Sequence, residues 1–135
     1  NGRRERFRLI PSSLITNTFI EAGEDTPEDI VSSTKNGIFV KSLSGGSVNP
    51  VTGVFNFTCR EVYLIEDGKR TVPVKGATLI GDGATALQQI RAIGNDLALD
   101  PGIGNCGKAG QWVPVGVGLP SLLIGGLTVG GSSAA

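Results

Sequence analysis

Apolar and polar residues alternate along the middle of the chain with the period of two that is typical of β-strands. The longest alternating stretch covers residues 54–65 and puts Cys59 and Val62 on opposite faces. Asp67 and Gly68 follow it, and this dipeptide predicts a tight hairpin turn because both residues tolerate a positive φ angle. The residues after the turn are expected to form the return strand.

Two short helices are predicted from capping signals and apolar spacing. Thr26 can cap the free backbone N–H groups of a first helix, and Pro27 suits its first position. That helix is expected to end near Gly37, because glycine accepts the left-handed geometry of a C-terminal cap. A second helix is predicted over residues 83–93, where apolar residues recur at helical spacing.

Glycines separate most of the remaining apolar stretches, and the chain holds 21 of them. Residues 1–13 are interpreted as an irregular lead-in, residues 112–127 as a β region interrupted by glycines, and residues 131–135 as a flexible tail. We therefore expect residues 1–135 to form a single domain. Its predicted class is mainly β (α+β), as an antiparallel sandwich or barrel-like β domain with two short helices.

The charges of the chain argue against several classes of partner. Twelve basic and twelve acidic residues cancel, so no overall field attracts nucleic acid or an anionic membrane. The basic cluster of Arg3, Arg4, Arg6 and Arg8 is interpreted as a segment end that faces a partner. No apolar run reaches the roughly 18 residues that a membrane span needs. We expect neither direct nucleic-acid binding nor a membrane partner.

Residue types that are missing from the chain narrow its chemistry further. The chain has no histidine, so a mechanism that needs an imidazole must take it from another segment. It has no methionine either, and we expect it to be a fragment of a longer protein. Two cysteines are too few for a disulfide framework, which favours reduced thiols in an intracellular protein.

The two cysteines are predicted to differ in role. Cys59 lies within a strand and is interpreted as a small buried hydrophobe. Cys106 lies among glycines on a predicted loop, with Lys108 as a nearby cation, so its thiol is expected to be accessible. As a nucleophile Cys106 lacks a histidine base in this chain, and as a metal ligand it lacks companions. Both roles stay open, and each needs groups from elsewhere.

Motifs spread along the chain carry a family resemblance. In the second half they are Lys75-Gly76-Ala77-Thr78-Leu79-Ile80-Gly81, Gly94-Asn95-Asp96-Leu97, Gly104-Asn105-Cys106-Gly107-Lys108-Ala109-Gly110-Gln111 and Pro114-Val115-Gly116-Val117-Gly118-Leu119-Pro120. Near the start they are Asn1-Gly2-Arg3-Arg4 and Thr16-Asn17-Thr18. Taken in order, the motifs resemble the C-terminal half of members of the TldD/PmbA family of metallopeptidases. The resemblance runs to about Gly131.

This resemblance implies a cytoplasmic zinc peptidase that acts on unfolded or extended peptides. Catalytic members of the family carry a His-Glu-x-x-x-His helix in a preceding domain, whose Glu is the general base. Their C-terminal domain adds a cysteine as third zinc ligand, and Cys106 matches it. Two histidines and one cysteine leave tetrahedral zinc an open position. Since the helix is missing here, the fragment is expected to be inactive alone and to bind zinc weakly.

The resemblance also implies partners for the chain. They are the domain that carries the histidines, a TldE/PmbA-like or identical subunit, and the peptide substrate. The family has also been called a modulator of DNA gyrase, a label that the balanced charge does not support as direct DNA binding.

A substrate-binding sheet edge is expected at Thr16, Asn17, Thr18, Val115 and Val117, where an extended peptide could add as a strand. The alternative is that these residues form ordinary core strands. Two other functions stay open: a non-catalytic peptide-binding or subunit-assembly module, and a thiol enzyme that uses Cys106. Zinc content of the longer parent protein would separate them.

Overall fold

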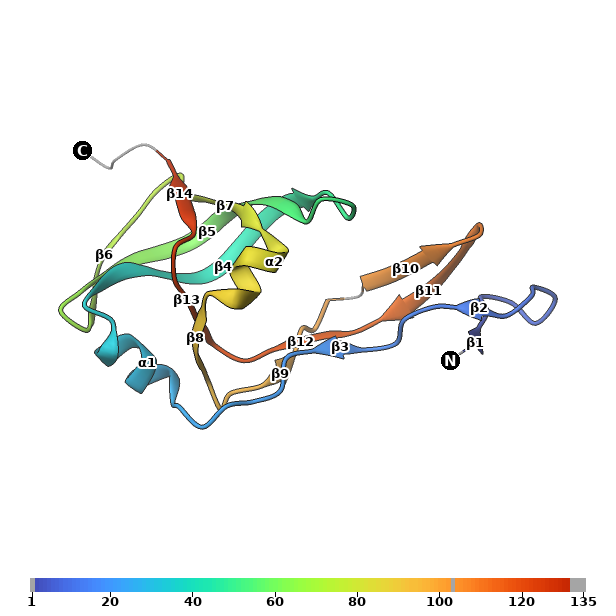
Figure 1. Ribbon diagram of the computed structural model, residues 1–135, viewed down its shortest axis with the longest axis horizontal. Coiled ribbons are helices and arrows are strands. Elements are labelled where there is room, and N and C mark those ends of the chain that lie inside the picture. Colours follow the sequence, from blue (N-terminus) through green and yellow to red (C-terminus); the bar gives the residue numbers. More distant parts are fainter. Residues whose placement is uncertain (1, 103, 132–135) are drawn as a thin grey trace.

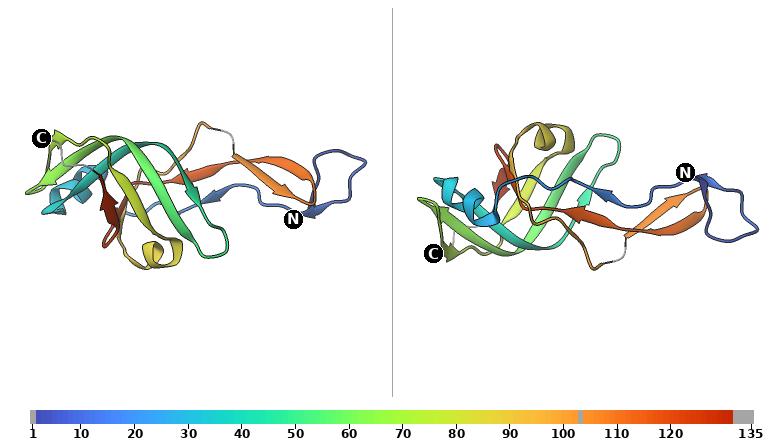
Figure 2. Two further views of the ribbon diagram at one scale, coloured as in Figure 1. Left: turned by 90° about the horizontal axis from the view of Figure 1, so that it is seen from above. Right: turned by 90° about the horizontal axis from the view of Figure 1, so that it is seen from below.

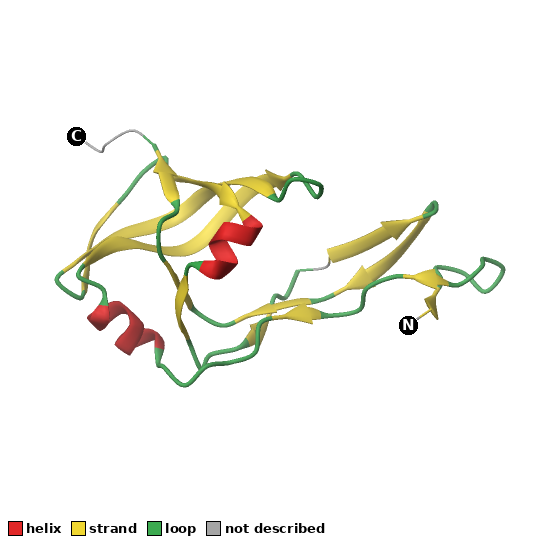
Figure 3. Ribbon diagram, in the orientation of Figure 1, coloured by secondary structure: helices red, strands yellow, loops and turns green. Residues whose placement is uncertain are grey.

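The computed structural model describes residues 2–102 and 104–131. It is elongated, with a body built around a sheet and a narrow arm that projects from the body (Figure 1). The views from above and below also show the arm clear of the body (Figure 2). The described part is mainly β with two short helices, which confirms the predicted class (Figure 3). Its strands form several small sheets and no closed barrel. The predicted tail at 131–135 lies almost entirely outside the described residues.

The body is organised around one long central strand. Its sheet contains β4 (Asn36–Val48), β5 (Val54–Glu66), β6 (Lys69–Pro73), β7 (Thr78–Asp82) and β14 (Thr128–Gly130). β5 pairs with β4 along one side, and β7 and β6 share its other side, all antiparallel. β14 pairs with β7 at the edge. The predicted hairpin between β5 and β6 is confirmed, with φ angles of 48° at Asp67 and 75° at Gly68.

Bulges change which residues of β5 face the core. The register between β4 and β5 shifts at several points between Val40 and Gly45. A bulge inserts an unpaired residue, so the alternation of faces moves by one position beyond it. As a result Cys59 and Val62 both lie in the core cluster with Ala77, and the prediction of opposite faces was wrong.

The first helix begins where the sequence predicts and ends earlier. α1 (Pro27–Ser33) is capped by Thr26, whose hydroxyl oxygen accepts a hydrogen bond of 3.1 Å from the backbone N–H of Asp29. The C-terminal cap is Thr34 rather than Gly37. The helix stops there because β4 begins at Asn36 and takes the following backbone groups into the sheet.

The second predicted helix, residues 83–93, is only half helical. α2 (Gly83–Gln88) begins at Asp82, whose carboxylate caps its first turn. Residues from Ile90 onward form β8 (Ile90–Ile93), which pairs with β13 (Leu122–Ile124). The apolar stripe that suggested a longer helix instead supplies a strand, because pairing with a distant segment outweighs local spacing.

The arm brings together segments that lie far apart in the sequence. Its strands are β1 (Gly2–Arg3), β2 (Ser12–Ser13), β3 (Thr18–Phe19), β9 (Ala98–Leu99), β10 (Gly104–Lys108), β11 (Gln111–Val115) and β12 (Val117–Leu119). β10 and β11 form an antiparallel hairpin, and β1 pairs with β2 within the predicted lead-in. β12 pairs in parallel with β3 and antiparallel with β9.

Three segments cross where the arm joins the body. The N–H of Gly23 donates to the carbonyl of Gly94 (2.9 Å), and the N–H of Gly94 donates to the carbonyl of Ser121 (2.7 Å). The Asp96 carboxylate accepts from the backbone N–H of Ser121 (2.8 Å) and from its hydroxyl (2.7 Å). These bonds lower the pKa of Asp96 below its ordinary value. The junction is therefore fixed by hydrogen bonds rather than by a large apolar core.

The described chain buries few apolar side chains. They are Leu14, Ile30, Cys59, Val62, Ile65, Ala77 and Val113. Five of them belong to the body, and two lie in the arm. No helix in the described ranges is long and apolar enough to cross a bilayer.

Candidate functional site

Cys106 lies in the middle of strand β10 rather than on a loop. It is the register partner of Val113 on β11. The chain reverses at Ala109 and Gly110, whose φ angles of 52° and 71° are those of a type I′ hairpin turn. The loop predicted from the glycines around Cys106 is wrong, because the residues that flank Cys106 pair with β11 in an antiparallel ladder.

The β10–β11 hairpin has one covered face and one open face. Directly opposed residues in an antiparallel pair point to the same side, so Cys106, Val113 and Gln111 share a face. Val113 is 3% and Gln111 is 5% exposed, which makes this the covered face. Trp112, 63% exposed, lies on the other face over Gly107. Cys106 is half-buried, and its thiol forms no disulfide.

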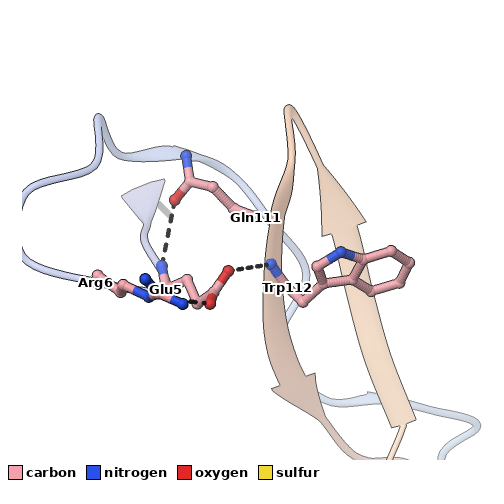
Figure 4. Close-up of polar contacts among 4 residues, drawn as sticks. All are labelled: Glu5, Arg6, Gln111 and Trp112. Atoms are coloured by element: carbon pink, nitrogen blue, oxygen red, sulfur yellow. Dashed lines mark hydrogen bonds and ion pairs between the residues drawn. The ribbon is translucent and has the colours of Figure 1, made fainter.

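The loop between β1 and β2 clasps the hairpin through Gln111, a contact that sequence reasoning missed (Figure 4). The side-chain oxygen of Gln111 accepts from the backbone N–H of Glu5 (3.2 Å), and its amide nitrogen donates to the carbonyl of Ile10 (2.8 Å). The Glu5 carboxylate accepts in turn from the backbone N–H of Trp112 (3.0 Å) and pairs with Arg6 (3.4 Å). The strand that faces Cys106 is thus held at its first two residues.

Two arginines of the basic cluster at the start of the chain form hydrogen bonds within the arm. The Arg3 guanidinium donates to the carbonyl of Pro114 (3.0 Å) and also to the carbonyl of Ile15. Arg4 donates to the carbonyl of Phe7 (2.7 Å). Both groups therefore bind backbone oxygens of the arm, and Arg3 extends the clasp along β11.

The structure brings together part of the predicted substrate-binding set of Thr16, Asn17, Thr18, Val115 and Val117. Thr18 and Val117 are register partners in the β3–β12 pair. The side-chain oxygen of Asn17 accepts from the N–H of Gly116 (3.0 Å) and fixes the entry into this pair. Val115 belongs instead to β11, and Thr16 precedes β3 as an exposed residue. β3 is an outer strand of its sheet, so it presents an edge.

The donor groups of the described chain do not assemble a metal site on their own. No group of three or more His, Cys, Asp or Glu in the described ranges is placed to hold a metal ion. The half-buried Cys106 thiol is a soft donor that fits zinc as one ligand of several.

Cys59 and the titratable groups of the body sheet have structural roles. Cys59 is buried in the core cluster, which confirms the expectation for it, and burial raises the pKa of its thiol. Glu61 accepts from Lys41 (2.9 Å) and from the Tyr63 hydroxyl (2.9 Å) on the body sheet. The hydrogen bond from Lys41 is the main cause that lowers the pKa of Glu61.

Comparison with known sequences gives a family match over nearly the whole chain. Residues 1–131 match the PmbA/TldA metallopeptidase C-terminal domain. A metalloprotease TldD homolog from Haemophilus influenzae is 49% identical over 133 residues, which are 98% of this chain and 28% of the relative. A zinc metalloprotease TldD homolog from Saccharolobus solfataricus is 28% identical over 97% of this chain and 29% of its own length. The chain thus spans less than a third of these relatives.

Two solved structures share the fold. TldE from Thermococcus kodakarensis matches with a TM-score of 0.77 at 23% identity, over 97% of this chain and 27% of that one. A Bacteroides thetaiotaomicron protein described as a candidate modulator of DNA gyrase matches with a TM-score of 0.63 at 28% identity, over 83% and 22%. The matching fold is in both cases a minor part of a much longer chain.

Proposed function

Because the chain belongs to the PmbA/TldA metallopeptidase family, we propose that it is the C-terminal domain of a zinc-dependent peptidase that acts on unfolded or extended peptides. The observation that carries this proposal is the position of Cys106. Its thiol is free, half-buried and fixed on a hairpin that the clasp of Glu5 and Gln111 holds in place. A ligand needs such a defined position, since metal sites tolerate little displacement of their donors.

In this proposal Cys106 is one zinc ligand, and a His-Glu-x-x-x-His segment of the preceding domain supplies the others. A zinc ion held by these residues would supply Lewis-acid polarisation of a peptide carbonyl. The role of this chain is to hold the thiolate in place. The chain alone is inactive because it has no histidine and one thiolate cannot hold catalytic zinc.

Substrate is proposed to bind at the arm. The outer strand β3 carries Thr18 next to Val117, with Thr16, Asn17 and Val115 close in sequence to this pair. An extended peptide that adds as a strand gains main-chain hydrogen bonds that do not depend on its sequence. This mode suits a peptidase for unfolded chains.

The proposed partners are a TldE/PmbA-like or identical subunit and the peptide substrate, in a cytoplasmic oligomer. Direct nucleic-acid binding is not part of the proposal. The twelve basic and twelve acidic residues balance, and Arg3 and Arg4 bond carbonyls of the arm.

Two cysteine variants of the full-length protein test the function. Cys106→Ala is expected to abolish hydrolysis of an unstructured peptide without unfolding the protein. Cys59→Ala, the matched control, is expected to keep activity and to lower the free energy of unfolding by roughly 1 kcal/mol, because it leaves a small cavity. Chelation should stop hydrolysis by the wild type.

Other outcomes favour the alternative functions. Hydrolysis that survives chelation but stops on alkylation of Cys106 would favour a thiol enzyme. A full-length protein that binds peptide and never hydrolyses it would favour a binding or assembly module.

A further inference from the structure

The three-stranded sheet in the arm is a ribbon with apolar side chains on one face. Phe19 and Leu99 are both register partners of Gly118 and therefore lie on the same side of it. A Cβ atom on Gly118 would lie 3.1 Å from each of their side chains, so these two side chains cover the glycine. Phe19 is 53% and Leu99 is 59% exposed. This face presents an aromatic and an aliphatic side chain to solvent.

The opposite face of the same ribbon is also mostly apolar, with Thr18 beside Val117 as its polar residue. Val117 and Leu119 flank Gly118 on β12, and alternation turns them to the other side. Val117 is 44% and Leu119 is 53% exposed. Antiparallel sheets in water commonly bury one face and keep the other polar. Here neither face is covered within the described chain.

The total accessible surface of the chain is also large for its mass. It is 9383 Å² for a mass of 13.9 kDa. A compact monomer of that mass would expose roughly 6,700 Å². The difference exceeds the roughly 800 Å² that one partner buries in a standard interface. The fold therefore exposes enough extra surface for a standard interface.

We propose that this ribbon is inserted between two layers of the remainder of the same polypeptide, which covers both of its faces. The chain covers 28% of its Haemophilus influenzae relative, so most of such a protein lies outside the matched part. A second copy related by a two-fold axis would offer one self-complementary patch and cover one face only. A bound peptide that adds as a strand would occupy an edge and cover neither face. Insertion would cover all four exposed apolar side chains, on both faces, at the same time.

Hydroxyl-radical footprinting of the unaltered full-length protein tests the insertion. The oxidation rates of Phe19, Leu99, Val117 and Leu119 are compared with those of the same residues in the urea-unfolded protein. The expected result is loss of oxidation at all four residues in the folded protein. Oxidation of either face at the unfolded rate would overturn the proposal.

Dilution identifies what covers the ribbon. Footprinting is repeated below the concentration at which the full-length protein dissociates into single chains. Protection that persists supports cover by the same polypeptide, whereas protection that disappears would assign it to a second copy and overturn the proposal. The test uses no change at Cys106, so the insertion and the metal site can fail separately.

Discussion

At the scale of single residues, Gln111 shows how one buried amide fixes a much longer segment. It bonds Glu5 and Ile10, which lie about a hundred positions earlier in the sequence. We predict that Gln111→Leu lowers the local free energy of opening of residues 5–10 by about 1–2 kcal/mol, because two hydrogen bonds are lost at similar side-chain volume.

Hydrogen exchange of the full-length protein measures this opening. Gln88→Leu, an exposed residue of α2, is the matched control and should leave exchange of the loop unchanged. Equal protection of residues 5–10 in wild type and Gln111→Leu would show that the clasp contributes nothing to the arm.

Among the elements, the β10–β11 hairpin contains a strained turn. Ala109 adopts a φ of 52°, which glycine accepts more readily than alanine. We predict that Ala109→Gly stabilises the hairpin by up to about 1 kcal/mol, because the left-handed region costs an L-residue roughly that much. Gly110→Ala, at a φ of 71°, should destabilise it. Amide protection along β10 measures both, and the opposite order of stabilities would contradict the assigned turn.

The junction of arm and body is expected to weaken in acid. The backbone N–H of Ser121 lowers the folded pKa of Asp96. A depressed carboxyl pKa stabilises the folded state above the unfolded value, near 3.9, and this contribution is lost as pH falls through the folded pKa. Amide protection factors at Ser121 should therefore drop as the pH falls below about 4. Asp96→Asn should show no such drop, and a similar drop in both proteins would assign it to other carboxyls.

The sequence predicted correctly those turns and helix starts that are determined by the residues at the turn or cap. The cap at Thr26 and the Asp67-Gly68 turn are such cases, because the residues themselves supply the bonds and backbone angles. Position 90 was assigned to a helix and forms a strand, since its partner on β13 lies more than thirty residues away. The predicted loop at Cys106 is a strand for a different reason, because the turn at Ala109 and Gly110 folds β11 back against it. Cys106 was proposed as a ligand from a family motif, whereas the clasp of Glu5 and Gln111 depends on contacts that no local pattern carries.

At the scale of the whole molecule, the described part of the chain has a small core and leaves many apolar side chains exposed. Its body has a small core around Cys59, Val62 and Ala77, and its arm exposes apolar side chains on both faces of a ribbon. The half-buried Cys106 lies on the same arm. A domain of this shape suits a role in which the arm supplies both packing and one ligand to a site completed elsewhere.

The zinc content of the full-length protein tests this account most directly. Wild type and Cys106→Ser are purified without added metal, and zinc is measured per chain by mass spectrometry, with circular dichroism to establish that both are folded. We expect about one zinc per chain in the wild type and loss of zinc in the folded variant, because a serine hydroxyl is not among the ligands that zinc prefers. A folded Cys106→Ser protein that retains the wild-type zinc content would contradict it.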